Sequence, residues 1–192
     1  MAWVKKTLVI IGSILGGLLL LCCGGGAVLL YLAPDNAYAQ PADVCTTSSV
    51  ASLSAFGTAG DQRSKPVTAF GRTFGSCVRS FDSGGTRVTL TIVVDVTDGD
   101  DDAKAHWDSA RAFAAAAGAG ANPEDVSGSW DHAFGYAGQD TYELDLCDSN
   151  LYLSLNVVGM PAGTARAALV ALAGELAKAL EKADSSGYDW DD

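Results

Sequence analysis

The segment RVTLTIVVDV, residues 87–96, decides the class of fold. Apolar residues occupy every second position and alternate with mostly polar ones. The apolar set is Val88, Leu90, Ile92, Val94 and Val96. A period of two is that of a β-strand with one face in the core and the other toward a polar environment. The sequence therefore predicts a half-buried strand here.

The neighbouring segments complete two hairpins. Residues 67–81 (VTAFGRTFGSCVRSF) predict a strand that runs into Cys77, and DSGGT then supplies a tight turn into residues 87–96. Residues 141–147 and 150–159 predict a second hairpin around the turn DSN. Its inward set is Leu151, Leu153, Leu155 and Val157.

Three helices are predicted around these hairpins. A short one begins near Ser48 or Ser49, and a longer one covers residues 100–117 with Gly118 as its stop. The apolar stripe of the longer helix is Trp107, Ala110, Phe113, Ala114 and Ala117. The last helix covers residues 164–183, and its stripe is Leu169, Leu172, Leu176 and Leu180. Residues 57–66 are predicted to be a loop, and residues 121–139 an irregular connector.

The order α-ββ-α-ββ-α predicts an α+β fold, with an antiparallel sheet of two hairpins covered by helices on one face. One transmembrane helix is expected before it. The expected parts are a short cytoplasmic end (1–6), an anchor (7–33), a tether (34–43), an exported domain (44–183) and a flexible acidic tail (184–192).

The N-terminal segment predicts a membrane anchor. Residues 7–34 contain no charge, and residues 7–33 exceed the roughly 20 residues that cross a bilayer. Lys5 and Lys6 precede the segment, so the N-terminus is expected in the cytoplasm and the domain outside the cell. Gly12 and Gly16 form a G-x-x-x-G that could join two spans, although glycine is common in membrane helices.

Two alternatives to an uncleaved anchor remain open for the N-terminal segment. Cleavage after Ala39 fits a small-x-small site, but the apolar stretch is longer than that of a signal peptide. Lipidation of Cys22 or Cys23 is also open, although Leu21 is a poor match to the small residue expected before a lipidated cysteine.

The net charge of the chain limits the classes of partner that it can bind. The chain carries 12 Lys+Arg and 23 Asp+Glu, a net charge of −11, and two of the lysines precede the predicted span. Such an acidic exported part repels nucleic acid, so no nucleic-acid partner is expected. The acidic C-terminal tail carries Tyr188 and Trp190, which could serve as an interaction motif or belong to a solubilising chain end.

Three cysteines lie beyond the predicted span: Cys45, Cys77 and Cys147. In an oxidising exterior two of them should pair and one should remain. The residues leave open which two pair. No spacing of cysteine and histidine suggests zinc, so neither a metal nor a cofactor is expected.

The candidate catalytic and metal-binding residues match no complete motif. Asp98, Asp100 and Asp102 alternate as in a calcium loop, but Ala103 and Ser109 stand where that loop needs glycine and glutamate. We therefore interpret them as a turn followed by an acidic first helical turn.

Ser129, Asp131 and His132 lie nearly side by side, whereas a catalytic triad usually converges from separate segments. We therefore assign no catalytic residue. The alternative is an exported hydrolase or thiol enzyme that uses His132 or Cys147.

The exported part resembles a group of actinobacterial membrane-anchored proteins and lipoproteins of unknown function with a small PsbP-like α+β domain. The shared features, over residues 43–183, begin with a cysteine that opens a short helix (Cys45) and a second cysteine on the first strand (GSCVRSF). The connector VSGSWDHAFGYA follows, with Val126, Gly128, Asp131 and Ala133 at the matching positions, and then a leucine- and alanine-rich last helix.

The resemblance implies a disulfide between Cys45 and Cys77, and it implies no catalytic residues. The poor lipidation site and the extra Cys147 depart from the group. Cys147 leaves open a Cys77–Cys147 bridge. The sequence as a whole predicts a binding or accessory module at the cell envelope, whose partner is an unidentified envelope ligand or membrane protein.

Overall fold

The computed structural model describes residues 37–69, 72–116 and 122–181. The predicted cytoplasmic end and anchor, Gly12 and Gly16, and the tail with Tyr188 and Trp190 lie outside these residues. Within the described residues, no helix combines the length and apolar character needed to cross a bilayer.

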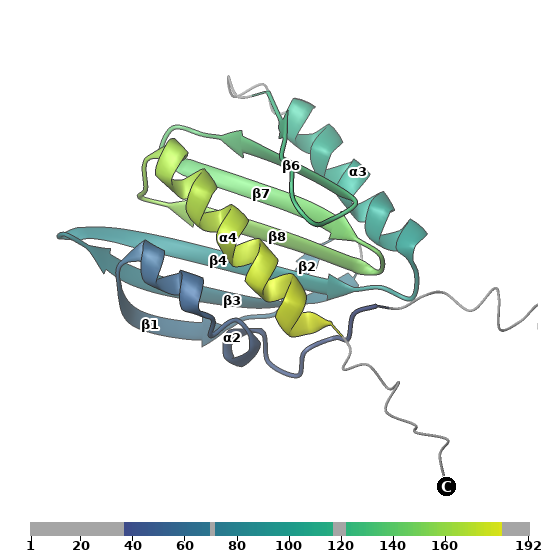
Figure 1. The fold of residues 1–192 in the computed structure, drawn as a ribbon, viewed down its shortest axis with the longest axis horizontal. Helices are drawn as coiled ribbons and strands as arrows, with labels where there is room; N and C mark the ends of the chain where they lie inside the picture. The colour runs from purple at the N-terminus through teal and green to yellow at the C-terminus, as the bar shows by residue number, and fades with distance from the viewer. Residues whose placement is uncertain (1–36, 70–71, 117–121, 182–192) are drawn as a thin grey trace, which may run out of the picture. The chain divides into compact units, whose positions relative to one another are not determined.

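The described part is α+β and is built on an antiparallel sheet in the order β1-β3-β4-β8-β7-β6-β5, with β2 pairing with β3 off this path (Figure 1). The strands are β1 (Thr58–Ser64), β2 (Val67–Ala69), β3 (Arg72–Ser83), β4 (Thr86–Val96), β5 (Glu124–Asp125), β6 (His132–Ala137), β7 (Thr141–Asp148) and β8 (Leu151–Val158). The helices are α2 (Val44–Thr47), the 3₁₀-helix η1 (Ala51–Phe56), α3 (Asp100–Ala116) and α4 (Ala162–Leu180).

The two predicted hairpins form the centre of the sheet. They meet where β4 pairs with β8, with Leu90 opposite Val157 and Ile92 opposite Leu155. All four side chains are fully buried, and the leucine stripe of α4 covers them. The alternation read in residues 87–96 therefore places one face of the sheet in the core, as predicted.

Both outer segments predicted to be irregular contain strands. The predicted loop at residues 57–66 contains β1, which pairs with β3 through a register shift between Ala59 and Gln62. The predicted connector contains β5 and β6. Every residue of β1 is exposed, so its sequence shows no alternation of apolar and polar residues. Only its pairing with β3 identifies it as a strand.

A short helix, α2, precedes the helix that the sequence predicted. The side chain of Asp43 accepts hydrogen bonds from the backbone N–H of Cys45 at 2.7 Å and of Thr46 at 3.4 Å, so it caps α2. The predicted short helix is the 3₁₀-helix η1. It begins a few residues later than Ser48 or Ser49, because Ser48 is the C-cap of α2 and Val50 is extended.

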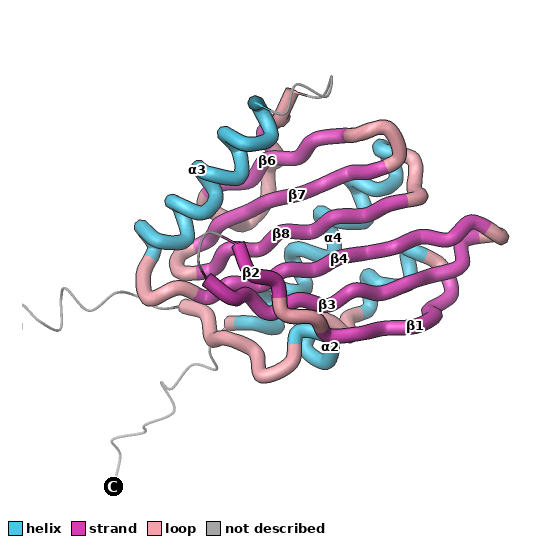
Figure 2. Tube along the Cα trace, turned by 180° about the vertical axis from the view of Figure 1, so that it is seen from behind, coloured by secondary structure: helices cyan, strands magenta, loops and turns pink. Residues whose placement is uncertain are grey.

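The helices do not share one face, which corrects the prediction. Figure 1 shows α4 in front of the sheet, and Figure 2 shows it behind the strands from the other side. Buried residues of α3 instead pack with Phe134 and Cys147, which alternate with the residues that face α4. The predicted stripe of α3 is also corrected at Phe113, which is 72% exposed. It lies six positions after the buried Trp107, on another side of the helix.

A disulfide joins Cys45 in α2 to Cys77 in β3, with Cα atoms 4.9 Å apart. Cys147 is a buried free thiol. It lies in β7, which two strands, β4 and β8, separate from β3. Three strand spacings are about 14 Å, which is too far for a bridge. The buried Arg79 guanidinium also donates hydrogen bonds to Cys45 O and, at 3.0 Å, to Ser49 Oγ, so it ties the same helix to β3.

Candidate functional site

A groove of about 440 Å³ runs between α4 and the connector that leads into β6. Four parts of the chain line it: the N-terminal segment, the connector, the end of β7 and the second half of α4. The lining residues are Tyr38, Gly128, Ser129, Trp130, Asp148, Val170, Gly174, Ala177, Lys178 and Glu181. Aromatic, apolar and charged side chains therefore meet in one hollow, as in many ligand sites.

Trp130 is held in the connector by two local features. Its indole Nε1–H donates a hydrogen bond to the backbone oxygen of Val126 at 3.1 Å. The ring also lies directly over Gly128, where an added Cβ would be 2.1 Å from Cζ2 of the indole. Glycine at this position therefore leaves the space that the ring occupies.

Gly128→Ala should lower the free energy of unfolding by about 1–3 kcal/mol, because the new methyl group must displace Trp130. The matched control is Gly174→Ala, in the interior of α4, where an added Cβ meets no atom within 4 Å. That change should stabilise the protein by up to about 1 kcal/mol through helix propensity. Thermal unfolding, monitored by circular dichroism, tests whether stability falls in the first variant and rises in the second. An unchanged stability of Gly128→Ala would contradict the packing argument.

Tyr38 is fixed to the groove by the buried Asn150. The Tyr38 backbone N–H donates to Asn150 Oδ1 at 3.0 Å, and Asn150 Nδ2 donates to Tyr38 O at 3.3 Å and to Thr97 O at 3.1 Å. Tyr38 also forms an isolated β-bridge with Glu181. The segment before α2 is thereby tied to the end of α4.

The turn between β7 and β8 positions the acidic side of the groove. Ser149 adopts a positive φ of 47°, and its N–H donates to Asp131 Oδ2 at 3.0 Å. Asp148 accepts a hydrogen bond from the Tyr38 hydroxyl. The turn therefore brings Asp131 and Asp148 close to Tyr38.

Burial and like charges act together on this side of the groove. Burial raises the pKa of Asp148, and the neighbouring Asp131 and Glu181 raise it further, against the hydrogen bond from Tyr38. Burial, followed by the bond to Asp148, raises the pKa of Tyr38. The Tyr38 hydroxyl therefore stays protonated and donates to the carboxylate.

A second polar cluster lies on the other face of the sheet, beside α3. Glu143 accepts hydrogen bonds from Tyr136 Oη at 2.8 Å and from Asn156 Nδ2 at 3.1 Å. Asp145 accepts one from Tyr152 Oη at 2.7 Å and is only 1% exposed. Burial raises the pKa of Asp145 to about 7, and the charge of Glu143 contributes in the same direction.

His132 and Cys147 are directly opposite each other on β6 and β7. His132 is exposed and stacks on Trp107, with ring centroids 5.1 Å apart. Burial, and then the charge of Asp131, raises the pKa of the Cys147 thiol to about 12. At neutral pH the thiol is therefore protonated, which is the unreactive form.

The other candidate residues have structural contacts. Asp131 binds the backbone of Ser149, while Ser129 is exposed at the groove. His106 Nδ1 lies 2.8 Å from Asp95 Oδ2, and its ring packs edge-on against Phe74 and Tyr152. Asp100 and Asp102 lie in the first turn of α3, as interpreted from the sequence. Over the part of the chain that the structure describes, no three metal-ligating side chains gather.

Sequence reasoning singled out the connector but missed the groove. Its pattern drew attention to Gly128 and Asp131, and the structure shows their roles: space for an indole and a bond to a turn. Tyr38 and Asp148 carry no comparable signal, because they are 110 residues apart and meet only in the fold. Trp130, two positions after Gly128 in the same connector, is the local signal that could have pointed to the groove.

No protein-family model matches this chain, and no curated protein matches it significantly.

Proposed function

We propose that this protein is a single-pass, membrane-anchored module of the cell envelope whose extracellular domain binds a ligand or partner in the groove beside α4. The observation that carries the proposal is the groove itself, where Trp130 and Tyr38 lie beside charged side chains of α4 and β7. Rigid supports hold both aromatic residues, which favours recognition of a preformed shape.

The location and family belong to the same proposal. The uncharged residues 7–34 support an anchor, with cleavage after Ala39 or lipidation at Cys22 or Cys23 as alternatives. The Cys45–Cys77 disulfide supports an oxidising compartment. The proposed relatives are the actinobacterial anchored proteins with a PsbP-like domain.

The alternative is an exported hydrolase or thiol enzyme. The buried, protonated thiol of Cys147 argues against a nucleophile. Stacking on Trp107 and pairing with β7 give His132 a structural explanation that needs no substrate. Binding is therefore the function that we favour.

Site-specific photo-crosslinking in the intact membrane tests whether the groove is occupied. A benzophenone amino acid replaces Ser129, which lines the groove, or the exposed Ser109 on α3 as the matched control. We expect a discrete adduct from position 129 only. Val170→Trp, which fills the groove, should abolish it. Equal labelling at both positions, or no effect of Val170→Trp, would contradict binding in the groove.

A further inference from the structure

We propose that the groove recognises a cationic side chain, the guanidinium or ammonium group of a basic segment in a partner protein. This inference rests on the proposed function and specifies the chemistry of the partner. It follows from the charges around the groove, the aromatic surface within it and the composition of the chain's C-terminal residues.

Acidic residues lie at the groove and beside it. Asp148, at the end of β7, and Glu181, at the C-cap of α4, line the groove. Asp131 lies beside them in the connector and accepts a hydrogen bond from Ser149 N–H. These carboxylates are close enough that Asp131 and Glu181 both raise the pKa of Asp148. A cation placed between them would relieve this mutual repulsion.

The C-terminal end of α4 adds to the negative electrostatic potential at the groove. The C-terminus of a helix carries a partial negative charge, which an acidic residue makes worse and a cation offsets. Glu181 is therefore electrostatically unfavourable where it stands. Lys178, in the last helical turn, is the one basic residue among the described residues that line the groove. Its side chain is exposed and can move aside for a ligand cation.

The aromatic side chains favour the same class of ligand. An indole face and nearby carboxylates together bind guanidinium and ammonium groups, the ring through its quadrupole and the carboxylates through charged hydrogen bonds. Trp130 is partly exposed at the groove, and its indole N–H is already bonded to Val126. The ring therefore offers surface to a ligand without a free donor that would attract an anion.

The chain's own C-terminal residues do not suit this groove. Residues 184–192 carry four aspartates and no basic residue, so the acidic groove repels them. A basic segment of another protein has the complementary charge and is the occupant to which the proposal commits.

The test uses the full-length protein in neutral detergent micelles and a fluorescein-labelled hexa-arginine peptide, followed by fluorescence anisotropy. Glu181→Gln should weaken binding about fivefold at low salt, and Trp130→Leu about tenfold. Lys178→Gln should strengthen binding about threefold, because it removes a positive charge that repels the ligand. Raising the salt concentration should weaken binding.

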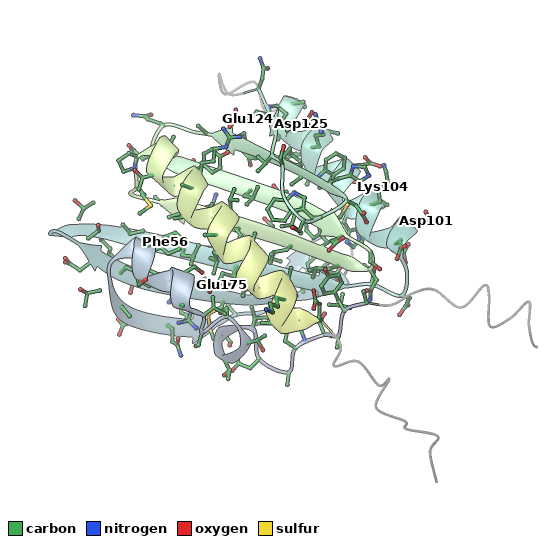
Figure 3. The ribbon with its side chains drawn as sticks, viewed as in Figure 1. Phe56, Asp101, Lys104, Glu124, Asp125 and Glu175 are labelled. Atoms are coloured by element: carbon green, nitrogen blue, oxygen red, sulfur yellow. A yellow bond between two sulfur atoms is a disulfide. The ribbon has the colours of Figure 1, made fainter. Side chains whose placement is uncertain are left out.

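The matched control separates the groove from the general acidity of the protein. Asp61→Asn removes the same charge as Glu181→Gln, but on the exposed edge strand β1, which lies across the sheet from β7 (Figure 3). It should change the affinity less than twofold. Equal losses from Asp61→Asn and Glu181→Gln, or a loss from Lys178→Gln, would overturn the proposal.

The experiments distinguish a failure of the binding proposal from a failure of the proposal that the ligand is cationic. If position 129 crosslinks a partner that Val170→Trp blocks, while the charge variants leave peptide binding unchanged, the groove binds a ligand that is not cationic. If no position in the groove crosslinks, the binding function itself fails.

Discussion

Replacing both Cys45 and Cys77 with alanine should lower the free energy of unfolding by about 3–4 kcal/mol. The disulfide closes a loop across a sequence separation of 32 residues, and the loss reflects the extra freedom of the unfolded chain without it. Because α2 has only four residues, its attachment to β3 should loosen most. Urea unfolding, with hydrogen exchange across α2, measures both effects.

The control for this prediction is Cys147→Ala, which removes a buried free thiol and should cost about 1 kcal/mol or less. A reducing agent should destabilise the unmodified protein as much as the double replacement does, and should leave the double variant unchanged. If reduction has no effect on the unmodified protein, Cys45 and Cys77 are not bonded. That result would also remove one support for the oxidising compartment.

Asp145→Asn should change how stability depends on pH. The pKa of Asp145 is raised from 3.8 to about 7 in the folded protein, so the folded state holds the proton more tightly than the unfolded chain. The stability from the protonated carboxyl is complete below about pH 4, and it is lost as the pH rises through about 7. The loss is on the order of 4 kcal/mol, because the pKa differs by about 3 between the two states and each unit of pKa corresponds to about 1.4 kcal/mol.

An asparagine at position 145 imitates the protonated acid. Its carbonyl can accept from Tyr152 Oη, and its amide can donate toward Glu143. The variant should therefore match the original protein at pH 4 and be more stable at pH 8.5. Thermal unfolding across this range tests it, with Asp61→Asn on the exposed β1 as the control that keeps the original pH dependence. Parallel curves for the original protein and Asp145→Asn would show that Asp145 is already ionised in the fold.

The centre of the fold could be predicted because its signals are local. Alternation in β4 and β8 and the leucine stripe in α4 each place apolar side chains on one side of an element. The edges could not be predicted in this way. β1 has no buried residue, and β6 is only six residues long, so both depend on pairing with a neighbour that sequence patterns do not reveal.

The candidate site could be predicted from the sequence even less well than the edges of the sheet. Gly128 and Trp130 mark it locally, but Tyr38, Asp148 and Glu181 come from three distant segments. Their proximity follows from the pairing of β7 with β8 and from the bonds of Asn150. No periodicity records such contacts, because each residue has its own local role until the chain folds.

The sequence by itself determined the class of fold, the two central hairpins and the amphipathic last helix, because these follow from the spacing of apolar residues along a single element. Tertiary structure alone decided that α3 lies opposite α4, that Cys147 stays out of the disulfide, and that a groove forms beside Trp130. These outcomes depend on strand order and on which face each strand turns toward a helix. Both are set by packing between segments that are far apart in the chain.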